Sequence, residues 1–258
     1  MKTAIISDVH GNIQALDAVL EDVVRQRVDD VYCLGDIVGY AAGPGECVRR
    51  VRDLGIPCVM GNHDEAVVGK YDNPELLLNS LKPEPRIATE WTVTKLSERE
   101  IGFLRNLPYK RDLGNLVMTH SNIINPGDFK VYVRYKSEQV QGNLEALKEG
   151  QKLFIGHTHK PWAVVVDGGV RYEENPEEVY LDSCIKAIFN VGSVGWPRTD
   201  DRKACYVVFD GARGRIVFRR VEYDVEAAAE AIRASGIDKN TARTLASYLL
   251  KKVEVGKA

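Results

Sequence analysis

Short apolar runs recur along the first 160 residues of the chain, and each of them stops at a polar residue or a glycine. The runs occupy residues 3–7, 30–34, 56–60, 115–119 and 152–155. Their length, their β-branched side chains and the glycines nearby predict β-strands. Residues 12–26 and 45–55, which separate the first three runs, repeat apolar positions at the spacing of an amphipathic helix. This alternation predicts an α/β fold with a mainly parallel sheet and helices outside it.

The second half of the chain carries a different pattern. From residue 162 onward, strand-like runs are joined by turns that contain glycine, and residues 210–214 have the composition of a hairpin turn. We expect these strands to belong to the second sheet. Two amphipathic helices, separated at Gly236, follow them.

Residues 65–114 interrupt the series of strands. Within them, residues 85–108 are helical in pattern, with a capping box at residues 97–100. Because no stretch rich in proline, glycine or serine and no repeat divides the chain, we expect one domain over residues 1–258 that contains residues 65–114 as a helical insertion. The insertion is either a packing helix pair or a cap that selects the substrate. Trp91 is expected to pack inside it rather than to stack on a base.

Composition argues against several classes of function. The chain has 258 residues, of which 44% are hydrophobic and 28% charged, and this balance is typical of a folded globular protein. A formal net charge of −2 gives no electrostatic basis for binding a nucleic acid or a membrane surface. No run approaches the ~18 apolar residues that cross a bilayer. The basic cluster at residues 48–52 is interpreted as the solvated face of a helix.

The cysteines indicate a reducing compartment. They are odd in number, widely spaced and without a CxxC pair: Cys33, Cys47, Cys58, Cys184 and Cys205. A disulfide framework or a zinc–thiolate site is therefore not expected. The N-terminal apolar segment also turns polar too soon for a signal peptide. We expect a cytoplasmic protein with buried free thiols.

All five histidines of the chain follow predicted strands, each beside a carboxylate, an amide or another histidine. The histidines are His10, His63, His120, His157 and His159, and the polar residues that share these strand ends are Asp8, Asp36, Asn62 and Asp64. One histidine alone would more often be structural, but five at strand ends are not explained as independent accidents. Because ligand sites form beyond the carboxyl ends of parallel strands, the pattern indicates that these residues gather in one metal-binding site.

The residue types narrow the choice of metal. Carboxylate and imidazole groups without thiolate suit Mn²⁺, Fe, Zn²⁺, Co²⁺ or Ni²⁺ better than Ca²⁺. Asp8 and His10 are two residues apart in an extended segment, so they point the same way and can hold one ion. His157 and His159 have the same spacing, although a bend at the strand end could aim them at two neighbouring ions.

A pair of ions about 3.5–4 Å apart needs a bridging group, and Asp36, alone after its strand, is the candidate. Such a pair lowers the pKa of a bridging water, so that hydroxide exists near neutral pH, and it neutralises charge in a phosphoryl transition state. A leaving alkoxide then needs a proton. His63, held by its neighbour Asp64, can supply that proton.

Five segments resemble the calcineurin-like metallophosphoesterase superfamily in its motif order, from residue 1 to about residue 160. They are DVHGN (8–12), GDIVGY (35–40), GNHD (61–64), His120 and GHTH (156–159). NVGSVGWPR (190–198) is also similar to the glycine-rich segment of the small bacterial and archaeal phosphodiesterases of that superfamily, with Val191 where proline is usual. The resemblance implies a four-layer α/β/β/α sandwich with a dinuclear site at one edge.

Carried over by position, the resemblance also implies a role for each residue. The first metal would be held by Asp8, His10, Asp36 and His159, and the second by Asp36, Asn62, His120 and His157. His63 would be the acid or the transition-state stabiliser, with Asp64 orienting it. GNHD in place of GNHE argues against membership of the protein serine/threonine phosphatase branch. Ser121 and Asn122 depart from the glycine that is common after the histidine, which affects specificity.

The hypothesis is a dinuclear metal-dependent hydrolase of phosphodiester or phosphomonoester bonds, acting by in-line attack of a metal-bridging hydroxide. Mn²⁺ is the expected metal, and a small phosphorylated compound, such as a dinucleoside polyphosphate or a cyclic nucleotide, is the expected substrate. A nuclease is disfavoured by the balanced charge. A metal-poor interaction scaffold is disfavoured because every ligand position is filled. Arg134 and Lys136 could touch a substrate phosphate, although a solvated edge is the preferred interpretation.

Overall fold

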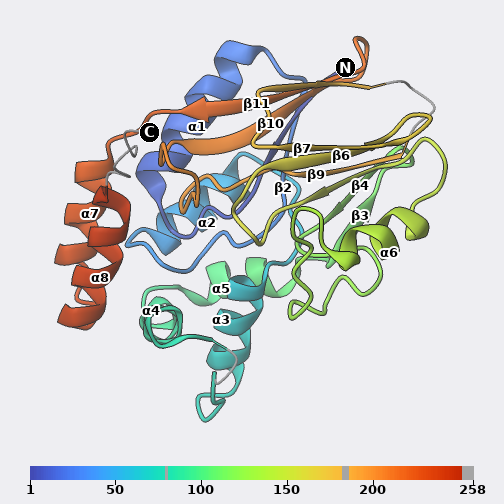
Figure 1. Ribbon diagram of the computed structural model, residues 1–258. Helices are drawn as coiled ribbons and strands as arrows, with labels where there is room; N and C mark the ends of the chain where they lie inside the picture. The colour runs from blue at the N-terminus through green and yellow to red at the C-terminus, as the bar shows by residue number, and fades with distance from the viewer. Residues whose placement is uncertain (79–80, 182–185, 252–258) are drawn as a thin grey trace.

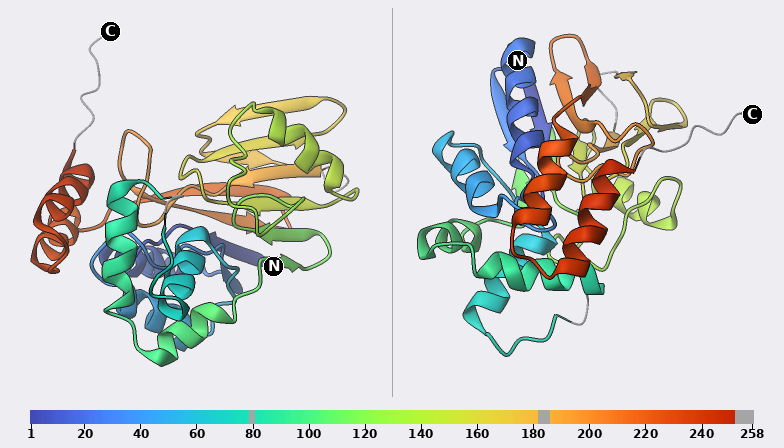
Figure 2. Two further views of the ribbon diagram at one scale, coloured as in Figure 1. Left: turned by 90° about the horizontal axis from the view of Figure 1, so that it is seen from below. Right: turned by 90° about the vertical axis from the view of Figure 1, so that its left-hand side faces the viewer.

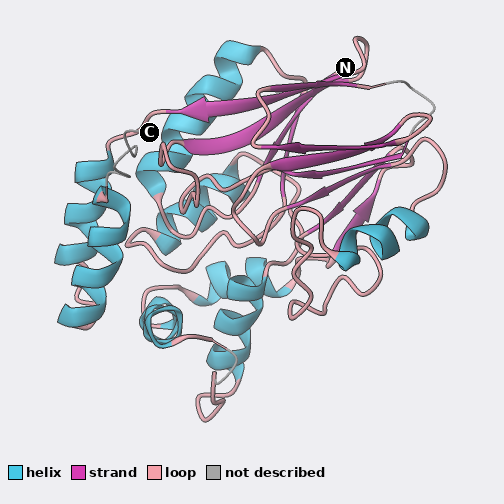
Figure 3. Ribbon diagram, viewed as in Figure 1, coloured by secondary structure: helices cyan, strands magenta, loops and turns pink. Residues whose placement is uncertain are grey.

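The computed structural model describes residues 1–78, 81–181 and 186–251, and in them the strands form two sheets (Figures 1 and 3). The first sheet has the order β2 (Asp30–Cys33), β1 (Lys2–Ile6), β10 (Ala204–Asp210), β11 (Arg215–Val221), β8 (Glu178–Tyr180). The second sheet has the order β3 (Lys110–Asp112), β4 (Leu116–Thr119), β5 (Lys152–Ile155), β9 (Lys186–Asn190), β6 (Trp162–Val166), β7 (Val170–Glu174).

Helices cover the outer faces of both sheets. α1 (Ile13–Gln26) and α2 (Pro44–Asp53) share an apolar core with the first sheet, and α6 (Glu138–Ala146) shares one with the second. Between the sheets lies a third core, in which Phe154 and Phe189 stack with ring centroids 5.3 Å apart. The predicted α/β/β/α arrangement of layers is confirmed.

The remaining helices lie beside this sandwich (Figure 2). α3 (Asn62–Asp72), α4 (Pro83–Val93) and α5 (Glu98–Arg105) form one group, and α7 (Val225–Ala234) packs on α8 (Lys239–Leu250). α8 also packs on α4, and Trp91 lies against this shared apolar cluster, as expected of a packing residue. None of the helices in the described part of the chain has the length and apolar character to span a membrane.

Local signals in the sequence account for where several helices begin. The Asn12 side chain accepts a hydrogen bond from the Ala15 amide at 3.1 Å and caps α1. The predicted capping box is confirmed, because Ser97 and Glu100 exchange side-chain bonds with each other's backbone amides at the start of α5. Gly236, with a φ of +83°, separates α7 from α8.

Three expectations about the strands are wrong. Residues 56–60 form only an isolated bridge between Cys58 and Cys33, because Pro57 has no amide hydrogen to extend the ladder. The sheets are mixed rather than mainly parallel: β1–β2, β4–β5 and β5–β9 are parallel, and the other pairs antiparallel. The strands after residue 162 do not all belong to the second sheet, although β6, β7 and β9 lie in it as expected. β10 and β11 form the predicted hairpin, but they return to the first sheet beside β1.

The insertion is helical, but its bounds differ from residues 65–114. α3 already begins at Asn62, and β3 pairs with β4 inside the second sheet. The cysteines are as expected where the structure describes them, since Cys33, Cys47, Cys58 and Cys205 are buried free thiols. Cys184 lies outside the described residues.

A buried ion pair ties α1 to the first sheet. Asp22 of α1 is 5% exposed, and both of its carboxylate oxygens accept hydrogen bonds from Arg219 of β11, at 2.9 and 3.0 Å. The hydroxyl of Tyr206 on β10 donates to the same carboxylate at 2.8 Å. Burial alone would raise the pKa of Asp22, but the bonds from Arg219 and Tyr206 hold that pKa below its usual value of 3.8.

We expect Asp22→Asn to lower the free energy of unfolding by about 2–3 kcal/mol, because it leaves the Arg219 guanidinium without its carboxylate. Urea denaturation measures the change. Because ionisation of Asp22 is favoured in the folded state, its contribution is complete above pH 3.8 and is lost as the pH falls through the lowered pKa.

Glu21→Gln is the matched control. Glu21 is the neighbouring residue on α1, its side chain is 74% exposed, and its ion pair with Arg25 spans 3.8 Å. It should change the unfolding free energy by less than about 0.5 kcal/mol. Equal losses in the two variants would show that the Asp22 network does not hold α1 in place.

Candidate metal centre

The ligand candidates meet at one edge of the sandwich. Asp8 follows β1 and Asp36 follows β2, and these two strands are parallel. His120 follows β4 and His157 follows β5, which are also parallel. Because the two sheets pack face to face on a shared core, the ends of all four strands converge.

The backbone at this edge is held in an unusual conformation. Five of the candidate ligands have a φ between +52° and +64°: Asp8, His10, Asp36, His157 and His159. A non-glycine residue in this left-handed region costs about 1–3 kcal/mol, so the surrounding structure must impose it. The Asp8 amide donates to the Gly35 carbonyl at 3.0 Å, and the His157 amide donates to the Asp8 carboxylate. Gly61 packs so closely on Asp36 that a Cβ there would collide with the Asp36 carboxylate.

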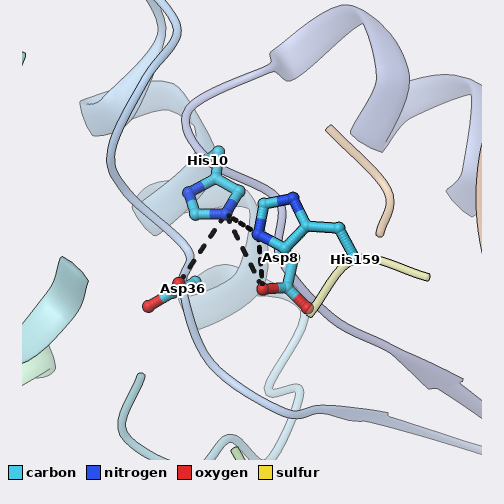
Figure 4. A group of neighbouring side chains, drawn as sticks. All are labelled: Asp8, His10, Asp36 and His159. Carbon is cyan, nitrogen blue, oxygen red and sulfur yellow. Dashed lines mark hydrogen bonds and ion pairs between the residues drawn. The ribbon is translucent and has the colours of Figure 1, made fainter. Parts of the chain in front are cut away.

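The first group of side chains consists of Asp8, His10, Asp36 and His159 (Figure 4). One possible ligand atom of each lies within 4.8 Å of those of the other three, and all four residues are buried. Nε2 of His10 lies 3.0 Å from Nε2 of His159, which is itself 3.2 Å from Oδ1 of Asp8. The group therefore gathers two imidazoles and two carboxylates around one point.

The second group consists of Asn62, His120 and His157, and it also faces Asp36. Oδ1 of Asn62 lies 2.9 Å from Nδ1 of His157 and 3.1 Å from Nε2 of His120. Oδ2 of Asp36 is 3.3 Å from Nε2 of His120 and 3.7 Å from Nε2 of His10. A single carboxylate oxygen thus faces both groups, and it has no hydrogen-bond partner among the described residues.

The outer nitrogens of three histidines fix which nitrogen carries the hydrogen. His120 donates from Nδ1 to the Leu34 carbonyl at 2.8 Å, and His157 donates from Nε2 to the Phe129 carbonyl at 3.0 Å. His159 donates from Nδ1 to the Trp196 carbonyl at 2.6 Å. Because a carbonyl only accepts, the inner nitrogen of each neutral ring bears a lone pair.

When His120 is neutral, lone pairs therefore face one another inside the site. Nδ1 of His157 lies 3.2 Å from Nε2 of His120, and the carbonyl oxygen of Asn62 faces both of them. Such acceptors repel unless a positive charge lies between them. The donor set of carboxylate, amide and imidazole, without thiolate, suits a divalent transition metal. The residues present thus fit the metal ions that the sequence predicts.

The electrostatics of the site also favour a cation. Burial by itself would lower the pKa of His120, but the facing Asp36 carboxylate outweighs burial and raises that pKa to about 10. Without a metal ion, a proton on His120 therefore supplies the positive charge, and a bound metal ion would take the place of that proton. Burial lowers the pKa of His157 to about 3 and that of His159 to about 4. Although burial opposes their ionisation, the surrounding histidines hold the pKa values of Asp8 and Asp36 below the usual range. Both carboxylates are therefore anionic at neutral pH.

His63 lies beside the first group rather than within it. Its backbone amide donates to Oδ1 of Asp36 at 2.8 Å, and its ring centroid is 4.8 Å from that of His10. Burial lowers the pKa of His63 to about 3, and Nδ1 has no partner among the described residues. The ring is therefore a neutral imidazole held at the edge of the candidate centre.

The hydrogen bonds described for the Asp64 carboxylate are with backbone amides rather than with the His63 ring. Its carboxylate accepts hydrogen bonds from the amides of Ile37 at 2.9 Å, Val38 at 3.2 Å and Gly61 at 3.2 Å. Burial, followed by the charge of Asp36, raises the pKa of Asp64 to about 7. The Asp64 side chain braces the loop after Asp36 against the start of α3, so any orienting effect on His63 passes through the backbone.

An aromatic stack, absent from the sequence prediction, supports the first group. The Tyr40 ring lies 4.6 Å from that of His10 and stacks on Trp196 at 4.7 Å. Trp196 in turn stacks on Tyr248 of α8 at 4.8 Å, with ring planes 6° apart. Tyr40 is the last residue of the GDIVGY motif, and Trp196 lies within NVGSVGWPR. The presence of an aromatic residue in each motif is the sequence signal from which this stack could have been predicted.

The departures at Ser121 and Asn122 shape a neighbouring loop. Both side chains are buried, and the Asn122 amide donates to the carbonyls of Asn125 at 3.0 Å and Asp128 at 3.1 Å. The Asn122 side chain also accepts from the Asn125 amide at 2.8 Å. Asn122 therefore organises the loop that precedes Phe129, whose carbonyl accepts the bond from His157.

Comparisons with known proteins agree with this site. Residues 1–214 match the sequence model of the calcineurin-like phosphoesterase superfamily domain. The crystal structure of a metallophosphoesterase from Sphaerobacter thermophilus is similar to this chain with a TM-score of 0.80 and 34% identity, covering 96% of this chain and 100% of that one. An uncharacterized protein of Methanocaldococcus jannaschii is 35% identical over 89% of this chain and 90% of its own length.

A more distant relative has a named activity. A symmetrical bis(5'-nucleosyl)-tetraphosphatase of Sodalis glossinidius is 32% identical over 66% of this chain, and the match spans 61% of that protein. The family match covers every candidate ligand, from Asp8 to His159. The chain belongs to the calcineurin-like phosphoesterase superfamily and is a metallophosphoesterase.

Proposed function

We propose that the chain hydrolyses a phosphodiester or phosphomonoester bond in a small nucleotide-like substrate with the aid of two divalent metal ions. The observation that carries this proposal is the position of Asp36, whose Oδ2 faces His10 on one side and His120 on the other. One carboxylate between two sets of lone pairs is the arrangement that a pair of ions requires.

Each ion has its own set of residues in this proposal. Asp8, His10 and His159 hold the first ion, Asn62, His120 and His157 hold the second, and Asp36 is shared. When bound, the ions supply charge to stabilise the phosphoryl transition state and lower the pKa of a nearby water. Mn²⁺ is the metal we propose, because the donors are oxygen and imidazole nitrogen.

His63 is the residue that we propose acts on the leaving group. Its ring is buried beside His10 and Tyr40, with centroids 4.8 and 4.9 Å away, and it is fixed through its backbone bond to Asp36. A ring N–H of this neutral imidazole can donate a hydrogen bond to the oxygen that leaves the phosphorus and stabilise the charge that develops on it. Asp64 holds the first turn of α3, which carries His63, against the loop that carries Asp36.

The choice of substrate has two lines of support. The similarity to a bis(5'-nucleosyl)-tetraphosphatase over 66% of the chain favours a nucleotide with phosphate bonds. The net charge of −2 argues against a long nucleic acid, whose phosphates are normally met by a strong excess of lysine and arginine.

We expect Asp36→Asn to bind fewer than one metal ion per chain, against about two in the unchanged protein. Removal of the shared negative charge should also reduce hydrolysis of an aryl phosphodiester and an aryl phosphomonoester by on the order of 10²-fold or more. Mass spectrometry of the metal content and assays with and without added Mn²⁺ measure both effects.

Asp167→Asn is the control for this experiment, because Asp167 lies in the turn between β6 and β7 and pairs only with the exposed Arg171 in the described chain. It should leave the metal content and the activity unchanged. Full activity in a sample stripped of metal by a chelator would disprove the proposed function.

We expect His63→Ala to retain both metal ions and to lose about 10²-fold or more in turnover. If His63 donates a hydrogen bond to the leaving oxygen, the loss should be greater for an alkyl ester, whose leaving oxygen develops more negative charge, than for a 4-nitrophenyl ester. Steady-state assays of both esters measure the difference. An equal loss for the two leaving groups would exclude this role for His63.

A further inference from the structure

A cavity of about 800 Å³ opens beside the second half of the candidate centre. One wall is a face of α3, with Glu65, Ala66 and Gly69. The other walls are the leucine segment (Leu76, Leu77, Leu78 and Leu81) and the loop from Gly127 to Tyr132. Cavities of about 300–1,000 Å³ hold small organic ligands, so the volume suits a nucleoside.

The cavity shares residues with the candidate metal centre. Asn62 lines it, and the Asn62 side chain faces His120 and His157. The Tyr132 ring, on the opposite wall, lies 4.2 Å from the His157 ring. A group bound in the cavity would therefore be directly connected to a phosphate at the metal ions.

The walls of the cavity expose apolar side chains to water. Leu77 is 75% exposed, Tyr132 40% and Leu76 37%, and all three line this cavity. Exposed apolar surface that gathers at one concave place is typical of a binding site. A ligand with an apolar face would cover it and gain the free energy of that burial.

The charges of the walls disfavour a second phosphate there. Glu65 and Asp128 are carboxylates, and Lys130 supplies one positive charge. One oxygen of Glu65 accepts from the Tyr109 hydroxyl at 2.6 Å, and Oδ1 of Asp128 accepts from the Lys130 amide at 3.1 Å. Among the described residues the other oxygen of each carboxylate accepts no hydrogen bond, so it can receive one from a ribose hydroxyl or a base amine.

We propose that this cavity binds the nucleoside of the substrate while its phosphate lies at the candidate metal centre. The inference rests on the proposed function and adds the place and the chemistry of substrate selection. Leu77 and Leu76 cover the apolar face of the nucleoside, and Glu65 and Asp128 accept hydrogen bonds from its polar edge. His63, which acts on the leaving group, lies beside the first group, whereas the cavity lies beside the second. The nucleoside therefore belongs to the part of the substrate that does not leave.

Two diesters test this inference: the 4-nitrophenyl ester of thymidine 5'-monophosphate and methyl 4-nitrophenyl phosphate. They release the same 4-nitrophenolate and differ only in having a nucleoside or a methyl group. We expect a kcat/KM about tenfold or more higher for the nucleoside ester in the unchanged protein with Mn²⁺. Leu77→Ser should remove most of this preference through KM and leave the methyl ester within about twofold.

Leu54→Ser is the matched control, because Leu54 is 59% exposed at the end of α2 and does not line the cavity. It should change neither ester. Ala66→Phe, which fills the cavity from α3, is a second variant, and it should reduce only the rate with the nucleoside ester. Circular dichroism establishes that each variant is folded.

Equal kcat/KM for the two esters, or equal losses in Leu77→Ser, would overturn the nucleoside site and leave the proposed hydrolysis intact. A fall with the methyl ester alone would also overturn it, since that ester would then be the one held in the cavity. If the Mn²⁺-loaded protein hydrolyses neither ester, the proposed function fails, and the nucleoside site fails with it.

Discussion

Two buried carboxylates that require a positive charge are the constraint on which this structure depends. Asp8 and Asp36 are at most 1% exposed, and the ion pairs described for them are with histidines rather than with lysine or arginine. Burying such charges is costly unless they are paired or bind metal. The convergence of these groups requires a left-handed backbone at five ligand positions and the close approach of Gly61 to Asp36. The sandwich supplies the rigidity that holds them.

The sequence predicts this convergence well because strand ends carry the chemistry. A parallel pair such as β1 and β2 places Asp8 and Asp36 side by side, whatever the rest of the sheet does. The expected layers and the Ser97 capping box depend on equally local signals. The metal-binding roles of these residues belong to the proposed function, whereas the fold itself brings their side chains together at one edge of the sandwich.

Other features depend on contacts between distant segments, which a single sequence does not reveal. The run at 56–60 has the composition of a strand, but Pro57 and the turn into α3 reduce it to one bridge. The return of β10 to β1 joins residues about 200 positions apart. Asp64 follows His63 directly, yet its carboxylate turns toward Ile37 and Val38. The cavity at Leu77 arises from three segments without any shared periodicity.

The aromatic stack bears on where this protein can be divided. The family match ends at residue 214, yet the rings that begin beside His10 continue through Tyr40 and Trp196 to Tyr248. The Arg202 guanidinium lies over the Tyr248 ring, 4.2 Å from its centroid. A boundary drawn at the end of the match would cut through this column and leave Trp196 facing solvent. The α7–α8 helix pair is therefore mechanically continuous with the candidate metal centre, and it is not an appendage that could be exchanged between relatives as a module.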